Sequence, residues 1–129
     1  IHIGTGCYLG CAGGVPLKDF NNISQGVKIY SKTDDFSGGS RTGPTVPKRY
    51  LNVKVKPVIL EKHVIVGSGS VILPGVLIGE GSSVGALSLV SKSLEEWGVY
   101  VGSPVKKLKA RKKKLLGMEI DLRNSANEL

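Results

Sequence analysis

A six-residue hydrophobic period governs the second half of the chain. Glycine follows three of the period residues, at Gly67, Gly79 and Gly85. The period residues themselves are Leu60, Val66, Ile72, Ile78, Val84 and Val90. An α-helix repeats every 3.6 residues and a strand every 2, so neither gives this spacing. A hexapeptide period is typical of a parallel β-helix, in which each hexad supplies one short strand and one turn, and three hexads make a coil.

The same period opens the chain and is lost in its middle. It starts at Ile3, slips by two residues before Leu17 and resumes at Ile23. Residues 1–30 and 58–95 therefore predict about two coils each. The period disappears over residues 31–57, which contain three prolines. A loop of this length inside a compact repeat is uncommon unless it is functional or disordered, so we expect it to leave the coil as an extended loop.

The end of the chain is strongly basic. Seven of the nine residues from Lys106 to Lys114 are Lys or Arg, within a net charge of +8. Pro104 suits the first position of a helix, so we predict a helix over residues 104–117. The predicted division is a β-helix domain over 1–103 and a basic C-terminal helix and tail over 104–129. Such a run faces solvent, the phosphates of a cofactor or, less strongly, a membrane surface. Nucleic acid is disfavoured because no aromatic residues interleave with the lysines.

The walls of the predicted coil are apolar. In each hexad the period residue and the residue two before it should point inward, and the residue between them outward. Five of the six outward residues in the second half are aliphatic, and Ser83 is the exception. The aliphatic five are Ile59, Ile65, Val71, Leu77 and Leu89. Apolar walls favour contacts with sister chains, and a three-sided coil makes a homotrimer the natural assembly.

Composition favours a narrow core in a cytoplasmic protein. Aromatic residues make up 5% of the chain, and 18 of its residues are glycine. This composition suits a thin interior of small aliphatic side chains. Of the two cysteines, Cys7 falls at an inward position, where a thiol packs as a small hydrophobe. No apolar run is long enough to span a membrane, and no signal peptide is visible. Because the period is already running at Ile1, we expect a further N-terminal portion.

Few side chains could carry chemistry. His63 is expected at a solvated turn and His2 outward on a strand, and two histidines cannot form a three-histidine zinc site. Asp34 and Asp35 lie at the start of the extended loop, next to Tyr30. Adjacent carboxylates on a loop usually form turns, but one could accept a proton from a sugar hydroxyl or an amine.

With the hexads and the loop placed, the chain resembles the left-handed β-helix acetyltransferases, in particular bacterial sugar O-acetyltransferases of the galactoside, maltose and lipopolysaccharide-modifying type. The matching stretches are 1–4, 27–31, 63–76, 83–92 and 100–106. The resemblance implies a trimer that binds acetyl-CoA in a groove between subunits. Ser24, Ser68 and Ala86 would line the pantetheine arm. Ser91 and Lys92 would lie near the adenine, and Lys106 and Lys109 near the phosphates, where lysine suits the charge.

The sequence departs from this family at the acceptor side. The catalytic histidine of the family corresponds to Asp34, and a sugar-contacting asparagine of the galactoside type corresponds to Gly10. Three interpretations remain: Asp34, with Asp35 beside it, supplies the base; a neighbouring chain supplies His2; or the acceptor is an amine, which needs a weaker base than an alcohol does.

We expect transfer of an acetyl group from acetyl-CoA to a sugar hydroxyl, in lipopolysaccharide or surface-polysaccharide assembly, without a metal. The alternatives are N-acetylation of a nucleotide-linked amino sugar and a non-catalytic β-helix scaffold.

Overall fold

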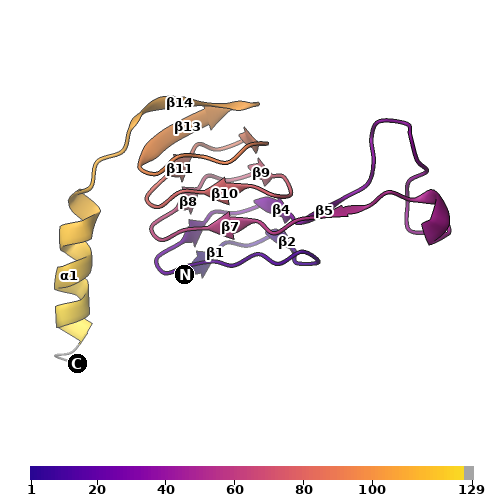
Figure 1. The fold of residues 1–129 in the computed structure, drawn as a ribbon. Coiled ribbons are helices and arrows are strands. Elements are labelled where there is room, and N and C mark those ends of the chain that lie inside the picture. The colour runs from indigo at the N-terminus through magenta and orange to yellow at the C-terminus, as the bar shows by residue number, and fades with distance from the viewer. Residues whose placement is uncertain (127–129) are drawn as a thin grey trace.

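The computed structural model describes residues 1–126 and shows a stack of three-sided coils (Figure 1). The first face joins β1 (His2–Ile3), β3 (Asn22–Ile23), β8 (Ile65–Val66), β11 (Ser83–Val84) and β13 (Gly98–Gly102). The second face joins β2 (Tyr8–Gly10), β4 (Lys28–Tyr30), β9 (Val71–Ile72) and β12 (Leu89–Val90). The third face has β7 (Ile59–Leu60) and β10 (Leu77–Ile78), extended by single bridges at Leu17 and Leu94. This parallel β-helix with an extended loop and a C-terminal helix is the predicted fold class.

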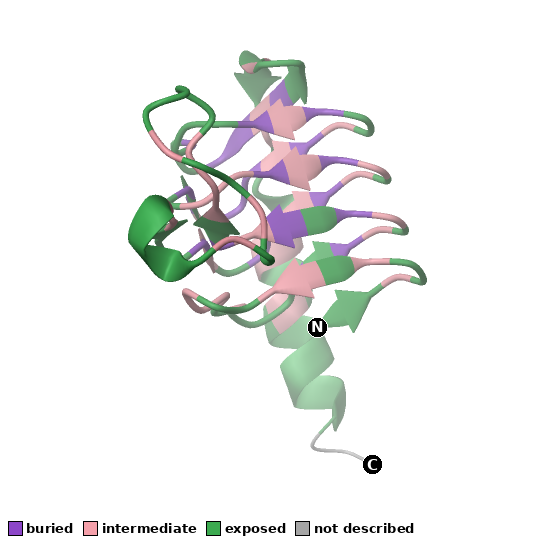
Figure 2. Ribbon diagram, turned by 90° about the vertical axis from the view of Figure 1, so that its right-hand side faces the viewer, coloured by how far each residue is buried: buried purple, intermediate pink, exposed green. Residues whose placement is uncertain are grey.

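The parallel register places equivalent hexad positions above one another. Ile23, Val66 and Val84 stack on the first face, and all are buried. The small inward positions are buried as well, and their hydroxyl groups are satisfied inside the coil. Ser70 donates to the carbonyl of Gly85 at 2.9 Å, and Ser82 donates to that of Glu95 at 2.6 Å. Figure 2 shows buried segments, in purple, recurring in successive coils of the stack. The predicted alternation of inward and outward residues is confirmed.

The extended loop is an arm that leaves the coil between the second and third faces. Its base is a short antiparallel pair of β5 (Lys32–Thr33) and β6 (Lys54–Val55). A single turn of 3₁₀ helix, η1 (Lys48–Tyr50), lies further out. Figure 1 shows the arm projecting away from the coils on the side opposite the C-terminal helix. Phe36, near its base, is 91% exposed.

The C-terminal part differs from the prediction of a helix over 104–117. β13 continues the first face through Gly102 and turns into β14 (Val105–Ala110), which pairs with it antiparallel. The helix α1 (Lys114–Ala126) begins only after this hairpin. The last coil would otherwise leave the edge of β13 with unpaired backbone groups, and β14 covers that edge. Within residues 1–126, no helix is long and apolar enough to cross a membrane.

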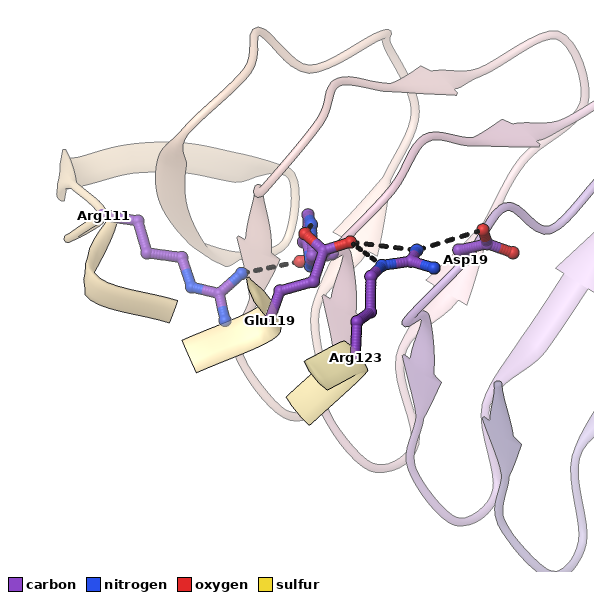
Figure 3. Close-up of polar contacts among 5 residues, drawn as sticks. Asp19, Arg111, Glu119 and Arg123 are labelled. Carbon is purple, nitrogen blue, oxygen red and sulfur yellow. Dashed lines mark hydrogen bonds and ion pairs between the residues drawn. The ribbon is translucent and has the colours of Figure 1, made fainter. Parts of the chain in front are cut away.

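α1 docks on the edge between the third and first faces, which we call the aromatic edge: Phe20, His63, Gly81 and Trp97. Figure 3 shows Glu119 and Arg123 of α1 directed toward the coils, with Arg123 reaching Asp19. His63 is therefore buried, and its prediction as a solvated turn is wrong. Its Nε2 lies 3.0 Å from Oε2 of Glu119 on α1, and its ring stacks on Phe20 with centroids 5.3 Å apart. Arg111 donates to the carbonyl of His63 at 2.7 Å.

Candidate active site

An open pocket of about 350 Å³ lies at the root of the arm. Its lining is Tyr8, Gly10, Cys11, Ala12, Tyr30, Ser31, Lys32, Thr33 and Asp34. Ser31 holds this root against the coil below it, because its buried hydroxyl donates to the carbonyl of Gly10 and accepts the N–H of Gly13 at 2.8 Å. The first residues of the arm are thereby fixed relative to β2 and β4.

The two aspartates at the root have different surroundings. The Oδ1 of Asp35 accepts the N–H of Ser37 at 2.9 Å, which closes a turn. Hydrogen bonds from the Ser37 side chain and backbone hold the pKa of Asp35 below its usual value, so this carboxylate is a poor proton acceptor. Asp34 instead lines the pocket. Of the two, Asp34 is the carboxylate placed to meet a ligand.

His2 lies on a different part of the molecule. It is exposed on β1 at the lower end of the first face, with its Nδ1 3.1 Å from Oδ1 of Asn22. It does not line the pocket at the arm root. Within one chain, His2 and Asp34 therefore do not form a common site.

A stripe of small residues follows the edge between the first and second faces, and we call it the small-residue edge: Ser24, Ser68 and Ala86, with Gly67 and Gly85. The coils are joined here by backbone hydrogen bonds from Gly69 to Gln25 at 3.0 Å and from Leu87 to Ser68 at 2.9 Å. Ser68 and Ala86 are exposed and Ser24 is partly exposed. With such small side chains, this edge can admit a thin, extended ligand close to the backbone.

The basic residues predicted to bind the cofactor fall into two places. Lys106 on β14 pairs with Val101 on β13, and a Cβ atom at Gly85 would lie 2.7 Å from the Val101 side chain. Lys106 therefore lies beyond the top of the small-residue edge. Lys109 is further back along β14, opposite Val99. Ser91 and Lys92 are exposed just after β12, on the edge from which the arm leaves two coils below.

One chain thus carries two half-sites on different edges. The small-residue edge with Lys106 is one, and the arm-root pocket with Asp34 is the other. Sequence reasoning missed Tyr8 and Cys11 as parts of the pocket, because their proximity to Asp34 depends on which coils stack. Within residues 1–126, no three His, Cys, Asp or Glu side chains are grouped so as to hold a metal ion.

The bacterial transferase hexapeptide (six repeats) family model matches residues 57–92. The chain is 41% identical over 126 residues to dTDP-4-amino-4,6-dideoxy-D-glucose acyltransferase of Escherichia coli, covering 98% of this chain and 66% of that protein. It is 34% identical over 107 residues to galactoside O-acetyltransferase of Lactococcus lactis, covering 81% of this chain and 50% of that protein.

A solved structure agrees with these relatives. The structure superposes with a TM-score of 0.94 and 48% identity on AntD, an N-acyltransferase from Bacillus cereus in complex with dTDP and 3-hydroxybutyryl-CoA. The superposition covers 98% of this chain and 68% of AntD. The chain thus spans about two thirds of AntD, just under two thirds of the Escherichia coli protein and half of the Lactococcus lactis protein. It belongs to the family of hexapeptide-repeat acyltransferases.

Proposed function

We propose that this protein transfers an acyl group from acyl-CoA to the amino group of a nucleotide-linked amino sugar. The observation that carries the proposal is the carboxylate of Asp34 in the arm-root pocket, where O-acetyltransferases of the resembled type have a histidine. An amine is more nucleophilic than an alcohol once it is neutral, so a carboxylate that holds and deprotonates it is sufficient. The Escherichia coli and Bacillus cereus relatives are acyltransferases named for such chemistry.

The spacing of two residues supports this assignment. Solved variants of AntD replace a serine and an aspartate that lie ten residues apart in its chain, in complexes with coenzyme A and dTDP or dTDP-4-amino-4,6-dideoxyglucose. In this chain, Ser24 and Asp34 are the one serine–aspartate pair with that order and spacing. Both were candidates from the sequence, Ser24 for the cofactor and Asp34 for the base.

The proposed reaction needs no covalent enzyme intermediate. The sugar ammonium group binds the Asp34 carboxylate and gives it a proton. The nitrogen lone pair then attacks the thioester carbonyl carbon, and the carbon–sulfur bond breaks. The leaving thiolate takes up the second proton that the nitrogen loses as the amide forms, and Asp34 releases its own proton to solvent. The products are an amide and free CoA thiol. Backbone N–H groups beside the thioester would stabilise the oxygen that becomes negative during the attack.

The acyl-CoA would lie along the small-residue edge. Ser24, Ser68 and Ala86 leave room for the pantetheine arm, and Lys106 would meet phosphate groups beyond the last coil. Lys109, Ser91 and Lys92 remain proposed contacts for the far end of the cofactor. The small-residue edge and the arm root are separate within one chain. We therefore propose a homotrimer in which each active site takes the small-residue edge from one subunit and the arm root from a neighbouring subunit. A cytoplasmic setting in surface-polysaccharide assembly is part of the same proposal.

The test compares Asp34→Asn with Asp35→Asn in an assay of thiol release. The donors are acetyl-CoA and 3-hydroxybutyryl-CoA, and the acceptors are dTDP-linked amino sugars and their hydroxyl counterparts. We expect turnover with an amino sugar and a loss of kcat of about 10²–10⁴-fold in Asp34→Asn. Asp35→Asn is the matched control, because its carboxylate only closes a turn, and it should retain activity within a few-fold.

Other results would replace the proposal with a stated alternative. Faster turnover of hydroxyl acceptors would favour sugar O-acetylation, the chemistry named for the Lactococcus lactis relative. An unchanged rate in Asp34→Asn would transfer the role of base to His2 of a neighbouring chain or to the substrate itself. No turnover, together with no rise in melting temperature on adding CoA, would favour a scaffold.

A further inference from the structure

Two tyrosines form one wall of the arm-root pocket. Tyr8 on β2 and Tyr30 at the end of β4 have ring centroids 5.3 Å apart and planes tilted by 39°. Both line the pocket that contains Asp34. Tyr8 is 52% exposed, so much of its surface remains available to a ligand. The pair is therefore an accessible aromatic surface beside the proposed reactive carboxylate.

The pair depends on a glycine. In the register between the two strands, Tyr30 lies opposite Gly10, whereas Tyr8 lies opposite Lys28. The Tyr8 ring has to lean over Gly10 to reach Tyr30. A Cβ atom at Gly10 would lie 3.0 Å from Cε1 of Tyr8 and 3.3 Å from its hydroxyl oxygen. Glycine at this position leaves the space that the Tyr8 ring occupies.

The chemistry of the pocket selects what can lie on this surface. A carboxylate binds an ammonium group, and the face of an aromatic ring favours apolar C–H groups over hydroxyl groups that need hydrogen-bond partners. A ligand that satisfies both is a sugar with an amine on one side and a methyl group, in place of a hydroxymethyl group, on the other. We propose that Tyr8 and Tyr30 form a platform for the apolar part of a deoxyamino sugar and make the enzyme prefer it to the hydroxylated analogue.

This inference rests on the proposed function, and it commits to the sugar in preference to the nucleobase. The reacting amine has to reach Asp34, which lines the same pocket as the two rings. The ring that carries the amine must therefore lie between the carboxylate and the tyrosines, and the nucleobase lies farther away. Tyr8 and Tyr30 are thus specificity residues of the acceptor, and they take no part in proton transfer.

The experiment measures kcat/KM for a nucleotide-linked 6-deoxyamino sugar and for its 6-hydroxy analogue. Wild-type protein should prefer the deoxy substrate. Tyr8→Ala should lower kcat/KM for the deoxy substrate by about 10–200-fold, the range for one apolar group in a pocket, and affect the hydroxy analogue much less. Tyr8→Phe is the control, because it keeps the ring and should keep the preference. Gly10→Val should also reduce the preference by displacing the Tyr8 ring while both tyrosines remain.

Two results would overturn the inference. One is an unchanged ratio between the two substrates in Tyr8→Ala and Gly10→Val, with melting temperatures showing that both variants are folded. The other is an equal loss of affinity for dTDP alone, which would mean that the tyrosines stack on the base. Failure of the proposed function looks different, because the wild-type protein would then acylate neither amino sugar.

Discussion

At the scale of single residues, the distance between coils limits what the small-residue edge tolerates. A Cβ atom at Gly67 would meet the backbone of the next coil, including the carbonyl carbon of Gly85 at 2.7 Å. Gly67→Ala should therefore destabilise the protein by about 1–3 kcal/mol, the usual cost of overpacking. Gly117→Ala is the matched control, since no atom lies within 4 Å of its added Cβ and the residue is in α1. It should stabilise by about 0.4–1 kcal/mol. Equal melting temperatures for the two variants would show that the coils separate freely at this edge.

Residue roles were predictable wherever they depend on the hexad alone. The period and its inward and outward positions identify the buried Val66 and Ile72 and the small-residue edge, because every hexad repeats the same local geometry. The roles that depend on distant coils were not predictable. Tyr8 approaches Tyr30 only because of the slip before Leu17 and the register that follows it. His63 could be placed at a turn, but its burial depends on the position of α1, which the hexads do not determine.

At the scale of elements, the coils and the arm followed from the sequence and the C-terminal hairpin did not. Lysine-rich sequence is compatible with a helix, and this local preference led to a helix predicted ten residues too early. Residues 105–110 instead form β14, because their backbone groups pair with the otherwise free edge of β13. Local helix propensity does not take this pairing into account. α1 then starts at Lys114 and reaches back to the aromatic edge.

The attachment of α1 should depend on pH through Glu119. Burial alone would raise the pKa of Glu119, but a hydrogen bond from Arg123 and the nearby His63 and Arg123 hold it below its usual value of 4.5. A depressed pKa means that the ionised carboxylate favours the docked state, and this contribution is lost as the pH falls below 4.5 through the folded pKa. Trp97, the one tryptophan, has its ring 6.3 Å from His63, so its fluorescence should report the loss.

Two variants of α1 separate this contact from general acid unfolding. Glu119→Gln should remove the change in Trp97 fluorescence near and below pH 4.5, because a neutral amide has no proton to gain there. Asp121→Asn, on the same helix and exposed, should retain it. The charged groups around the contact are Arg111, Lys113, Arg123 and Asp19, and both variants keep them all. An identical acid transition in both would assign the change to other carboxylates.

At the scale of the whole molecule, the two half-sites predict rescue between inactive subunits. Ala86→Trp should block the small-residue edge with a large side chain, and Asp34→Asn should remove the base from the arm root. If each active site takes one half-site from each of two subunits, some sites in mixed trimers contain neither change. Random mixing at equal amounts should then restore about a quarter of the wild-type rate, since half of the subunits are intact at each half-site.

The controls of the rescue experiment distinguish a failure of the subunits to assemble or exchange from a failure of catalysis. Light scattering first establishes the trimer, and exchange of a labelled subunit establishes mixing. The double variant, mixed with either single variant, leaves no site with both halves intact and should give no recovery. No rescue after demonstrated exchange would mean that both half-sites act within one subunit. The arm would then have to bend from the position in Figure 1 toward the small-residue edge of its own coil.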